Sequence, residues 1–164
     1  MTAISTQHAS TPASRPDTAL DGQCLTVEVG GQSFGIPALR VHDVLGPQRI
    51  TRVPLAPSEV AGALNLRGRA VTAIDLRLRL GLPPRARGEA PMNIVVDCGD
   101  EHYGLLVDRV GEVLTLSAAD FEPSPKTLDG RWRDLSTGIY RLEGRLLVLL
   151  DIDRLYRFDR PEAA

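Results

Sequence analysis

The stretch GALNLRGRAVTAIDL, residues Gly62–Leu76, shares its pattern with GIYRLEGRLLVLLDI, residues Gly138–Ile152. Each places a short polar tip between two apolar runs, and runs of this length bounded by turn residues are typical of buried strands. The tips NLRG, 65–68, and RLEG, 141–144, both fit a type I turn, which favours Asn first and Gly fourth. The sequence therefore predicts two β-hairpins with charged tips.

A second pair of segments repeats as well. QSFGIPALRVHDVL, 32–45, and EHYGLLVDRVGEVL, 101–114, share their aromatic, glycine, arginine, valine and acidic positions at an offset of 69 residues. The hairpins have an offset of 76, as between Gly62 and Gly138, so the later copy carries seven extra residues in its connector. A fixed offset within each block indicates a duplicated unit of about seventy residues.

Each copy is predicted to be a small β structure. LTVEV, 25–29, alternates apolar and polar residues before the turn Gly30-Gly31, and Gly99-Asp100 stands at the same place in the later copy. The segment RVHDVLG, 40–46, fits helix and strand periods, but its twin contains Gly111, which favours a strand. Many short, evenly spaced strands predict an all-β fold with one small barrel per copy.

Short helical turns are expected at three places. Asp75 and Asp151 each end a buried run and are placed to cap a helical turn that follows. The segment SEVAGAL, 58–64, follows two prolines and is predicted to be helical too.

Composition describes an ordinary water-soluble domain. Of the 164 residues 43% are hydrophobic and 24% charged, with a net charge of −2, which gives no general attraction to nucleic acid or anionic membranes. Six arginines lie between Arg67 and Arg87 and could form a positive strip for an acidic protein surface. Arginine is the usual cation of this chain, however, so a solvated face is the better interpretation.

Cysteine placement and the chain ends predict a reduced, cytosolic protein. Cys24 is predicted on the polar side of its strand and Cys98 on the inner side, so a disulfide between them is not expected. Residues 1–22 and 159–164 are predicted to be tails, the first of them flexible and without the features of a signal peptide. No apolar run is long enough to span a bilayer, so membrane association would require a partner.

Residues with catalytic or metal-binding potential are scattered. His8, His42 and His102 have no second ligand at a metal-binding spacing, so no metal site and no cofactor are expected. The sequence lacks the G-x-S-x-G, P-loop and Rossmann glycine patterns. We therefore expect a protein that is not an enzyme.

Three blocks carry a family resemblance. VHDVLGPQRITRVPLAPSEVAGALNLRGRAVTAIDL, YGLLVDRVGEVL and LLVLLDIDRL together resemble the CheW family of bacterial chemotaxis coupling proteins, over residues 23–158. The resemblance implies two five-stranded SH3-like barrels packed side by side around a shared core. The first barrel would span about residues 32–90 and the second about 91–158, with an exchanged strand near 23–31.

The resemblance also implies a function. Family members are adaptors without catalytic activity that join the cytoplasmic tip of methyl-accepting chemoreceptors to the regulatory domain of the histidine kinase CheA. Such a protein would be cytoplasmic and recruited to membrane-associated receptor arrays through its partners. The implied kinase contact is near Gly62, and the implied receptor-binding residues are Val41, Asp43, Val44, Arg67, Val110 and Val113.

The residues themselves leave alternatives open. The four valines fit a core position as well as a groove, and Asp43 could pair within its own barrel. Arg67 could be a solvated turn residue or one tied to a nearby carboxylate, although Glu143 at the equivalent tip indicates that the turn itself does not require arginine. A bidentate contact with a carboxylate would require it.

Other functions remain possible at this point. An adaptor of another chemosensory pathway, such as twitching motility, is the nearest alternative. The fold also occurs in kinase regulatory domains, although the start and end of the chain favour a free-standing adaptor. A nucleic-acid-binding barrel would use the arginines but would need interleaved aromatic residues and a basic net charge, which this sequence lacks.

Overall fold

Strands make up most of the computed structural model, which describes residues 22–123 and 130–157. The strands are β1 (Gly22–Val29), β2 (Gln32–Pro37), β3 (Val41–Leu45), β4 (Val60–Leu66), β5 (Arg69–Asp75), β6 (Met92–Cys98), β7 (Glu101–Val107), β8 (Arg109–Leu116), β9 (Phe121–Glu122), β10 (Ser136–Leu142) and β11 (Arg145–Leu150). The helices are α1 (Leu76–Arg79), α2 (Gly130–Leu135) and α3 (Ile152–Leu155). The predicted all-β class is confirmed. The predicted tails lie outside the described residues, apart from Gly22, which begins β1.

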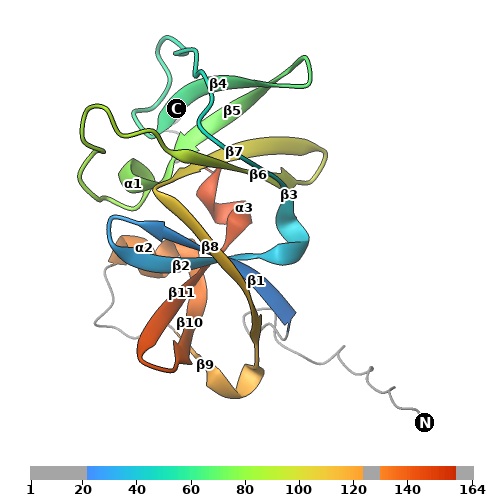
Figure 1. Ribbon diagram of the computed structural model, residues 1–164, viewed down its shortest axis with the longest axis vertical. Coiled ribbons are helices and arrows are strands. Elements are labelled where there is room, and N and C mark those ends of the chain that lie inside the picture. The colour runs from blue at the N-terminus through green and yellow to red at the C-terminus, as the bar shows by residue number, and fades with distance from the viewer. Residues whose placement is uncertain (1–21, 124–129, 158–164) are drawn as a thin grey trace, which may run out of the picture.

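The strands form two sheets. One has the order β8-β1-β2-β11-β10-β9 and the other β3-β6-β7-β5-β4. Figure 1 shows the five-stranded sheet in the upper half of the molecule and the six-stranded sheet in the lower half, with α3 between them. Among the described residues no helix combines the length and hydropathy needed to cross a membrane.

The two copies of the repeat exchange their first hairpins. β1 and β2 belong to the sheet with β8, β10 and β11, whereas β6 and β7 belong to the sheet with β3, β4 and β5. Two equivalent parallel pairings hold the exchange, Phe34 beside Val148 and Thr72 beside Tyr103. The sheets therefore do not follow a division of the chain near residue 91, and the exchange is reciprocal rather than limited to the first strand.

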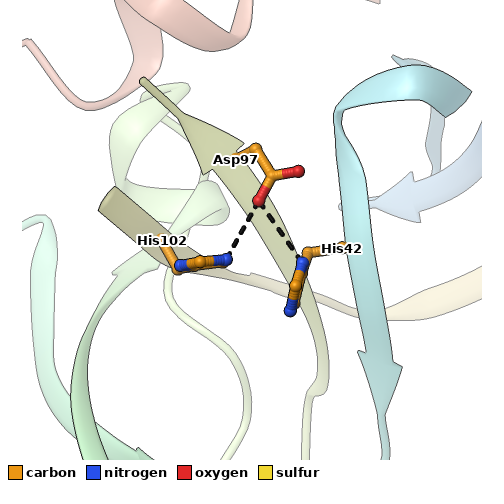
Figure 2. Close-up of side chains that lie close together, drawn as sticks. All are labelled: His42, Asp97 and His102. Carbon is orange, nitrogen blue, oxygen red and sulfur yellow. Dashed lines mark ion pairs between the residues drawn. The ribbon is translucent and has the colours of Figure 1, made fainter. Parts of the chain in front are cut away.

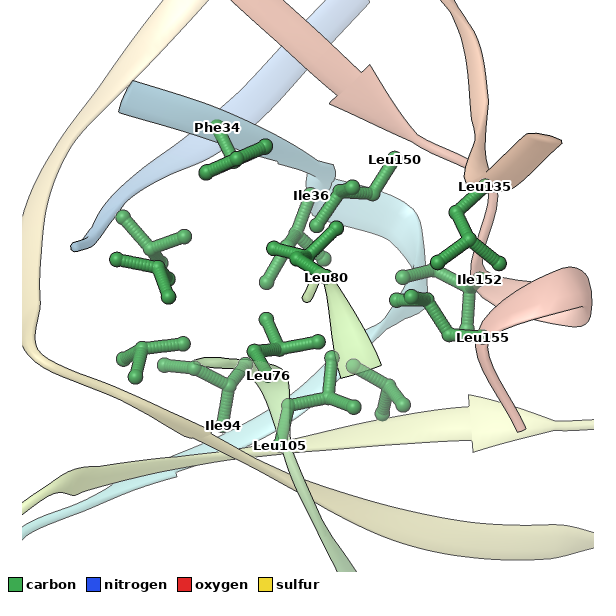
Figure 3. Packing of buried hydrophobic residues seen from close by; sticks show 14 of the residues in the cluster. Phe34, Ile36, Leu76, Leu80, Ile94, Leu105, Leu135, Leu150, Ile152 and Leu155 are labelled. Carbon is green, nitrogen blue, oxygen red and sulfur yellow. The ribbon is translucent and has the colours of Figure 1, made fainter. Parts of the chain in front are cut away.

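The largest hydrophobic cluster lies between the sheets. It includes Phe34 and Ile36 from β2, Ile94 and Leu105 from the other sheet, and Leu150 from β11, all less than 2% exposed. Figure 3 shows these side chains facing one another across the junction. Burial of each such side chain contributes about 1.5–3 kcal/mol. The two sheets thus share one core.

A smaller cluster lies inside each sheet. Tyr140, Leu147 and Leu149 lie in the cluster of the six-stranded sheet, and Leu64 and Val71 in that of the five-stranded sheet. Each sheet therefore encloses its own interior besides contributing to the shared core, as expected for two curled sheets packed side by side.

The hairpin tip and one predicted helix need correction. β4 pairs Leu66 with Arg69, so the loop is the two residues Arg67-Gly68, with φ of 52° and 87°, and not the predicted type I turn. Two positive φ values are the property of a type I′ turn. The predicted helix 58–64 is wrong, because Val60–Leu66 is strand β4, whose Ala63 exchanges two backbone hydrogen bonds of 2.8 Å with Thr51.

Several local predictions are confirmed. The Asp75 side chain accepts a hydrogen bond from the backbone N–H of Arg77 at the start of α1. The Asp151 side chain accepts one from the N–H of Arg154 at the start of α3. Residues 41–45 form strand β3, as the twin segment indicated.

Both cysteines are free and buried, so the prediction that Cys24 faces solvent is wrong. Cys24 packs in the interior of the six-stranded sheet with Tyr140 and Leu147, because β1 lies between β8 and β2 and has little exposed surface. Burial raises the pKa of the Cys24 thiol to about 11, against a smaller opposing effect of a backbone hydrogen bond at Leu114. Burial likewise raises the pKa of Cys98 to about 11, despite the positive charge of Arg40.

These pKa values predict low thiol reactivity. At pH 8 a thiol of this kind is only about 0.1% ionised, so alkylation of Cys24 and Cys98 in the native protein should be slow. Timed treatment with iodoacetamide, followed by mass spectrometry, should show little modification until denaturant is added and both sites after it. Rapid labelling of native Cys24 would contradict the burial described here.

Candidate partner-binding site

The candidate site is centred on an ion pair between the hairpin tip and strand β3. Arg67 Nη2 lies 3.0 Å from Asp43 Oδ2, with 71% of the arginine side chain and 25% of the aspartate side chain exposed. The other carboxylate oxygen of Asp43 accepts a hydrogen bond of 2.9 Å from the N–H of Val44. The resemblance implied Asp43 and Arg67 as two individual receptor-binding residues, and the structure shows that they are neighbours. Asp43 holds the Arg67 guanidinium in position.

Arg67 also has an unusual backbone conformation. Among the described residues other than glycine, only Leu55 and Arg67 have a positive φ. For a residue with a β-carbon this left-handed conformation costs roughly 1–2 kcal/mol, and asparagine or glycine would adopt it more easily. Glu143, at the equivalent tip, lies outside this region. The turn therefore disfavours arginine at position 67, and the contact within the fold that favours it is the ion pair with Asp43.

The four candidate valines divide into two kinds. Val41 and Val110 are partly buried and pack against the shared core. Val44 and Val113 are exposed, at 41% and 53%. They lie on β3 and β8, which are the edge strands of their sheets. An edge strand presents unpaired backbone groups and side chains to a partner, so the exposed pair fits a docking surface, and the other pair packs beneath it against the core.

Gly62, predicted at a kinase contact, is buried in β4. Its φ is 147°, and a β-carbon there would lie 2.2 Å from the carbonyl oxygen of Thr51. Glycine is thus required by the backbone at this position. A kinase contact in this region stays a prediction, and it would be made by residues that cover Gly62 rather than by Gly62 itself.

The arginine strip is largely occupied within the chain. Arg77 donates to both carboxylate oxygens of Asp108, and Arg85 donates to the same carboxylate at 3.0 Å. Arg79 donates to the backbone carbonyls of Leu155, Arg154 and Arg157. With Arg67 bound to Asp43, four of the six arginines are engaged. This removes the main support for a nucleic-acid-binding surface.

Asp108 is the centre of that network. Burial opposes its ionisation, but hydrogen bonds from Arg77, from the N–H of Gly30 and from Arg85 outweigh burial and lower the pKa of Asp108. The hydrogen bond to Asp108 in turn raises the pKa of Arg77. Asp108 therefore joins α1, the loop after it and the β1–β2 turn through charge-assisted hydrogen bonds.

The sequence did not reveal one cluster near this site. His42 Nδ1 and His102 Nε2 lie 3.4 Å and 3.0 Å from the same oxygen of Asp97. Figure 2 shows the two imidazole rings facing that oxygen. The two-residue turn Gly99-Asp100 places Asp97 opposite His102, so this half of the cluster was predictable. The position of His42 depends on the strand order β3-β6-β7, for which the sequence carries no local signal.

The fold and these surfaces define a two-barrel binding protein, and comparisons with known proteins identify its family. The sequence profile of the CheW-like domain matches residues 23–159. The chemotaxis protein CheW of Rhizobium meliloti (strain 1021) is 31% identical over 142 residues, covering 87% of this chain and 92% of the relative. CheW of Klebsiella aerogenes is 33% identical over 131 residues, covering 80% and 79%. Protein PilI of Pseudomonas aeruginosa is 28% identical over 120 residues, covering 73% and 67%.

A solved structure agrees. The scaffolding protein TtCheW from Thermoanaerobacter tengcongensis superimposes with a TM-score of 0.76 at 25% identity, covering 85% of this chain and 95% of that protein. The chain belongs to the CheW-like domain family. The predicted architecture of two SH3-like barrels packed side by side is confirmed, and a scaffolding role in chemotaxis follows from the family.

Proposed function

We propose that this protein is a non-catalytic adaptor that couples the cytoplasmic tip of chemoreceptors to the regulatory domain of the histidine kinase CheA. The observation that carries the proposal is the match to the CheW-like domain over residues 23–159, together with an exposed Arg67 at a tip that disfavours arginine. We place the protein in the cytoplasm, held at receptor arrays by its partners.

The receptor surface of this proposal consists of the two exposed valines, Val44 and Val113, and the Asp43–Arg67 pair. A helical receptor tip offers apolar side chains to the valines and a carboxylate to the guanidinium, whose planar fork binds carboxylates bidentately. Val41 and Val110 support this surface from the core side. The kinase would bind separately, near the segment that covers Gly62.

Separate surfaces let weak contacts build a stable assembly. Small transient interfaces suffice, because each bound partner raises the effective concentration of the next in an array of many components. The shared core joins both barrels into one body, so the adaptor would hold its two partners at a fixed separation.

We expect Arg67→Glu to weaken capture of a receptor-tip fragment by at least about tenfold, with little effect on capture of the kinase domain. The variant replaces an exposed cation by an anion beside Asp43, so it removes the cation offered to a receptor carboxylate. An exposed pair contributes about 1 kcal/mol or less to stability, so the variant should remain folded. Titrations of the purified protein with each fragment, separately and together, measure both affinities.

Two further variants serve as controls. Glu143→Arg makes a charge change of equal size and opposite sign at the equivalent tip and should leave receptor capture unchanged. Asp43→Arg combined with Arg67→Glu keeps an ion pair but reverses its direction, so receptor capture should stay weak even though the pair is retained. Equal losses for both partners in Arg67→Glu, or recovery of receptor capture in the double variant, would contradict a direct contact. Binding only to receptors of another chemosensory pathway would favour the second adaptor function.

A further inference from the structure

Three neighbouring strands bring His42, Asp97 and His102 together on one surface. β6 lies between β3 and β7 in the five-stranded sheet, and each strand supplies one of the three side chains. Asp97 and His102 are direct cross-strand partners, so their side chains leave the sheet on the same face. The cluster therefore follows from the sheet order and does not depend on flexible loops.

The backbone of β3 is irregular at His42. Val41 pairs with Val96 and Asp43 with Val95, so the register shifts and His42 is the extra residue. An extra residue of this kind re-aims its own side chain. Here the imidazole lies beside Asp97, and its ring is 4.1 Å from that of His102 between centroids, at 70°.

Two of the separations between the polar atoms are close to those of a tetrahedral metal site. With bonds of about 2.0–2.1 Å, neighbouring ligand atoms around zinc are about 3.3 Å apart. His42 Nδ1 and His102 Nε2 lie 3.4 Å and 3.0 Å from Asp97 Oδ1, and one ligand atom from each residue lies within 4.8 Å of the others (Figure 2). Two imidazoles and one carboxylate are a ligand set that zinc and related metals prefer.

Solvent has access to the cluster. The side chains of His42, Asp97 and His102 are 36%, 43% and 31% exposed. The two histidines also line a cavity of about 590 Å³, which Arg67 lines as well. An ion therefore has an entry path, and a water molecule or a partner residue has room to complete the coordination.

We propose that His42, Asp97 and His102 form a binding site for a divalent transition metal of the zinc class. The ion would join edge strand β3 to the β6–β7 hairpin and so fix the strand that carries Asp43 and Val44. The proposal depends only on the geometry of these three residues and is independent of the adaptor function. Without an ion, the same groups form a His–Asp–His cluster of hydrogen bonds or ion pairs. A measurement of zinc affinity therefore decides between a metal site and a cluster that is held only by these contacts.

The test is a zinc titration of the full-length, untagged protein by isothermal calorimetry. One ion per chain should bind, and His42→Ala or His102→Ala should weaken that binding about 100-fold or more, since loss of even an outer partner of a ligand costs 10–100-fold. The matched controls are His8→Ala, the third histidine of the chain, and Asp100→Asn, a neighbouring carboxylate outside the cluster. Both should bind zinc like the unchanged protein.

Two other measurements do not depend on heats of binding. Cobalt should give the intense visible bands of four-coordinate geometry in the unchanged protein but not in Asp97→Asn. Zinc should also raise the melting temperature of the unchanged protein but not of the three cluster variants, by linkage of binding to folding. Equal zinc affinity in the unchanged protein and both histidine variants, or loss of binding in His8→Ala, would overturn the proposal.

Discussion

Replacing Gly62 by alanine is expected to lower the free energy of unfolding by roughly 3 kcal/mol or more. The new β-carbon would lie 2.2 Å from the carbonyl oxygen of Thr51 and 2.8 Å from Cγ2 of Ile50. Thr51 cannot move away freely, because its N–H and carbonyl both hydrogen-bond Ala63 at 2.8 Å. Relief of the clash would break that bridge, and the φ of 147° would remain strained for alanine. Urea unfolding followed by circular dichroism measures the loss.

Gly68→Ala is the matched control for this prediction. Gly68 also has a positive φ, of 87°, but a β-carbon there would meet nothing within 4 Å. Only backbone strain applies, so we expect a loss of about 1 kcal/mol. Gly138, the repeat equivalent of Gly62, would place its β-carbon 2.4 Å from the Phe121 ring, so Gly138→Ala should resemble Gly62→Ala. If Gly62→Ala were no less stable than Gly68→Ala, the close approach to Thr51 would be refuted.

Asp108→Ala is expected to destabilise the fold by about 2–4 kcal/mol, because it leaves two poorly exposed arginines without their common carboxylate. Arg77 and Arg85 have side chains that are 18% and 9% exposed, and both donate to Asp108. The N–H of Gly30 loses its acceptor as well, at 2.8 Å in the present structure. Thermal and urea unfolding report the change. Glu122→Ala removes an exposed ion pair with Arg141 and should leave the unfolding midpoint nearly unchanged.

The same carboxylate makes stability depend on pH. The pKa of Asp108 is lowered in the folded protein, because its hydrogen bonds outweigh the effect of burial. The unfolded chain therefore takes up the proton first as the pH falls. The contribution of Asp108 is complete above the ordinary carboxyl pKa of about 4 and is lost as the pH falls through the lowered value. Unfolding measured from pH 6 to pH 2 should show a shallower decline in Asp108→Asn, and equal slopes would contradict this assignment.

Repetition made much of the fold predictable. The hairpins, the strand at 41–45 and the caps at Asp75 and Asp151 follow from local patterns that occur twice, and each copy supports the other. Arg67 was identified as a tip residue for the same reason, although Glu143 at the equivalent tip does not share its positive φ.

Apart from the turn type at residues 67–68, the wrong or missing predictions share a physical cause, which is pairing between distant segments. Residues 58–64 form a strand because Ala63 bridges to Thr51 and β4 pairs with β5. Cys24 is buried because β1 lies between β2 and β8, which comes from the other copy. The approach of His42 to His102 depends on the same kind of long-range order. Alternation within one strand carries no information on which strands will flank it.

The reciprocal exchange of hairpins has a consequence for how such a chain came to exist. A lone copy, comprising the equivalents of β1 to β5, would need the same parallel pairing for its first hairpin, either with its own last strand or with that of a second molecule. Pairing with a second, identical molecule that did the same in return would reproduce the exchange seen here. The present protein therefore has the topology of a domain-swapped homodimer whose two subunits were fused end to end, after which each half could acquire different surface residues, such as Arg67 and Glu143 at equivalent tips.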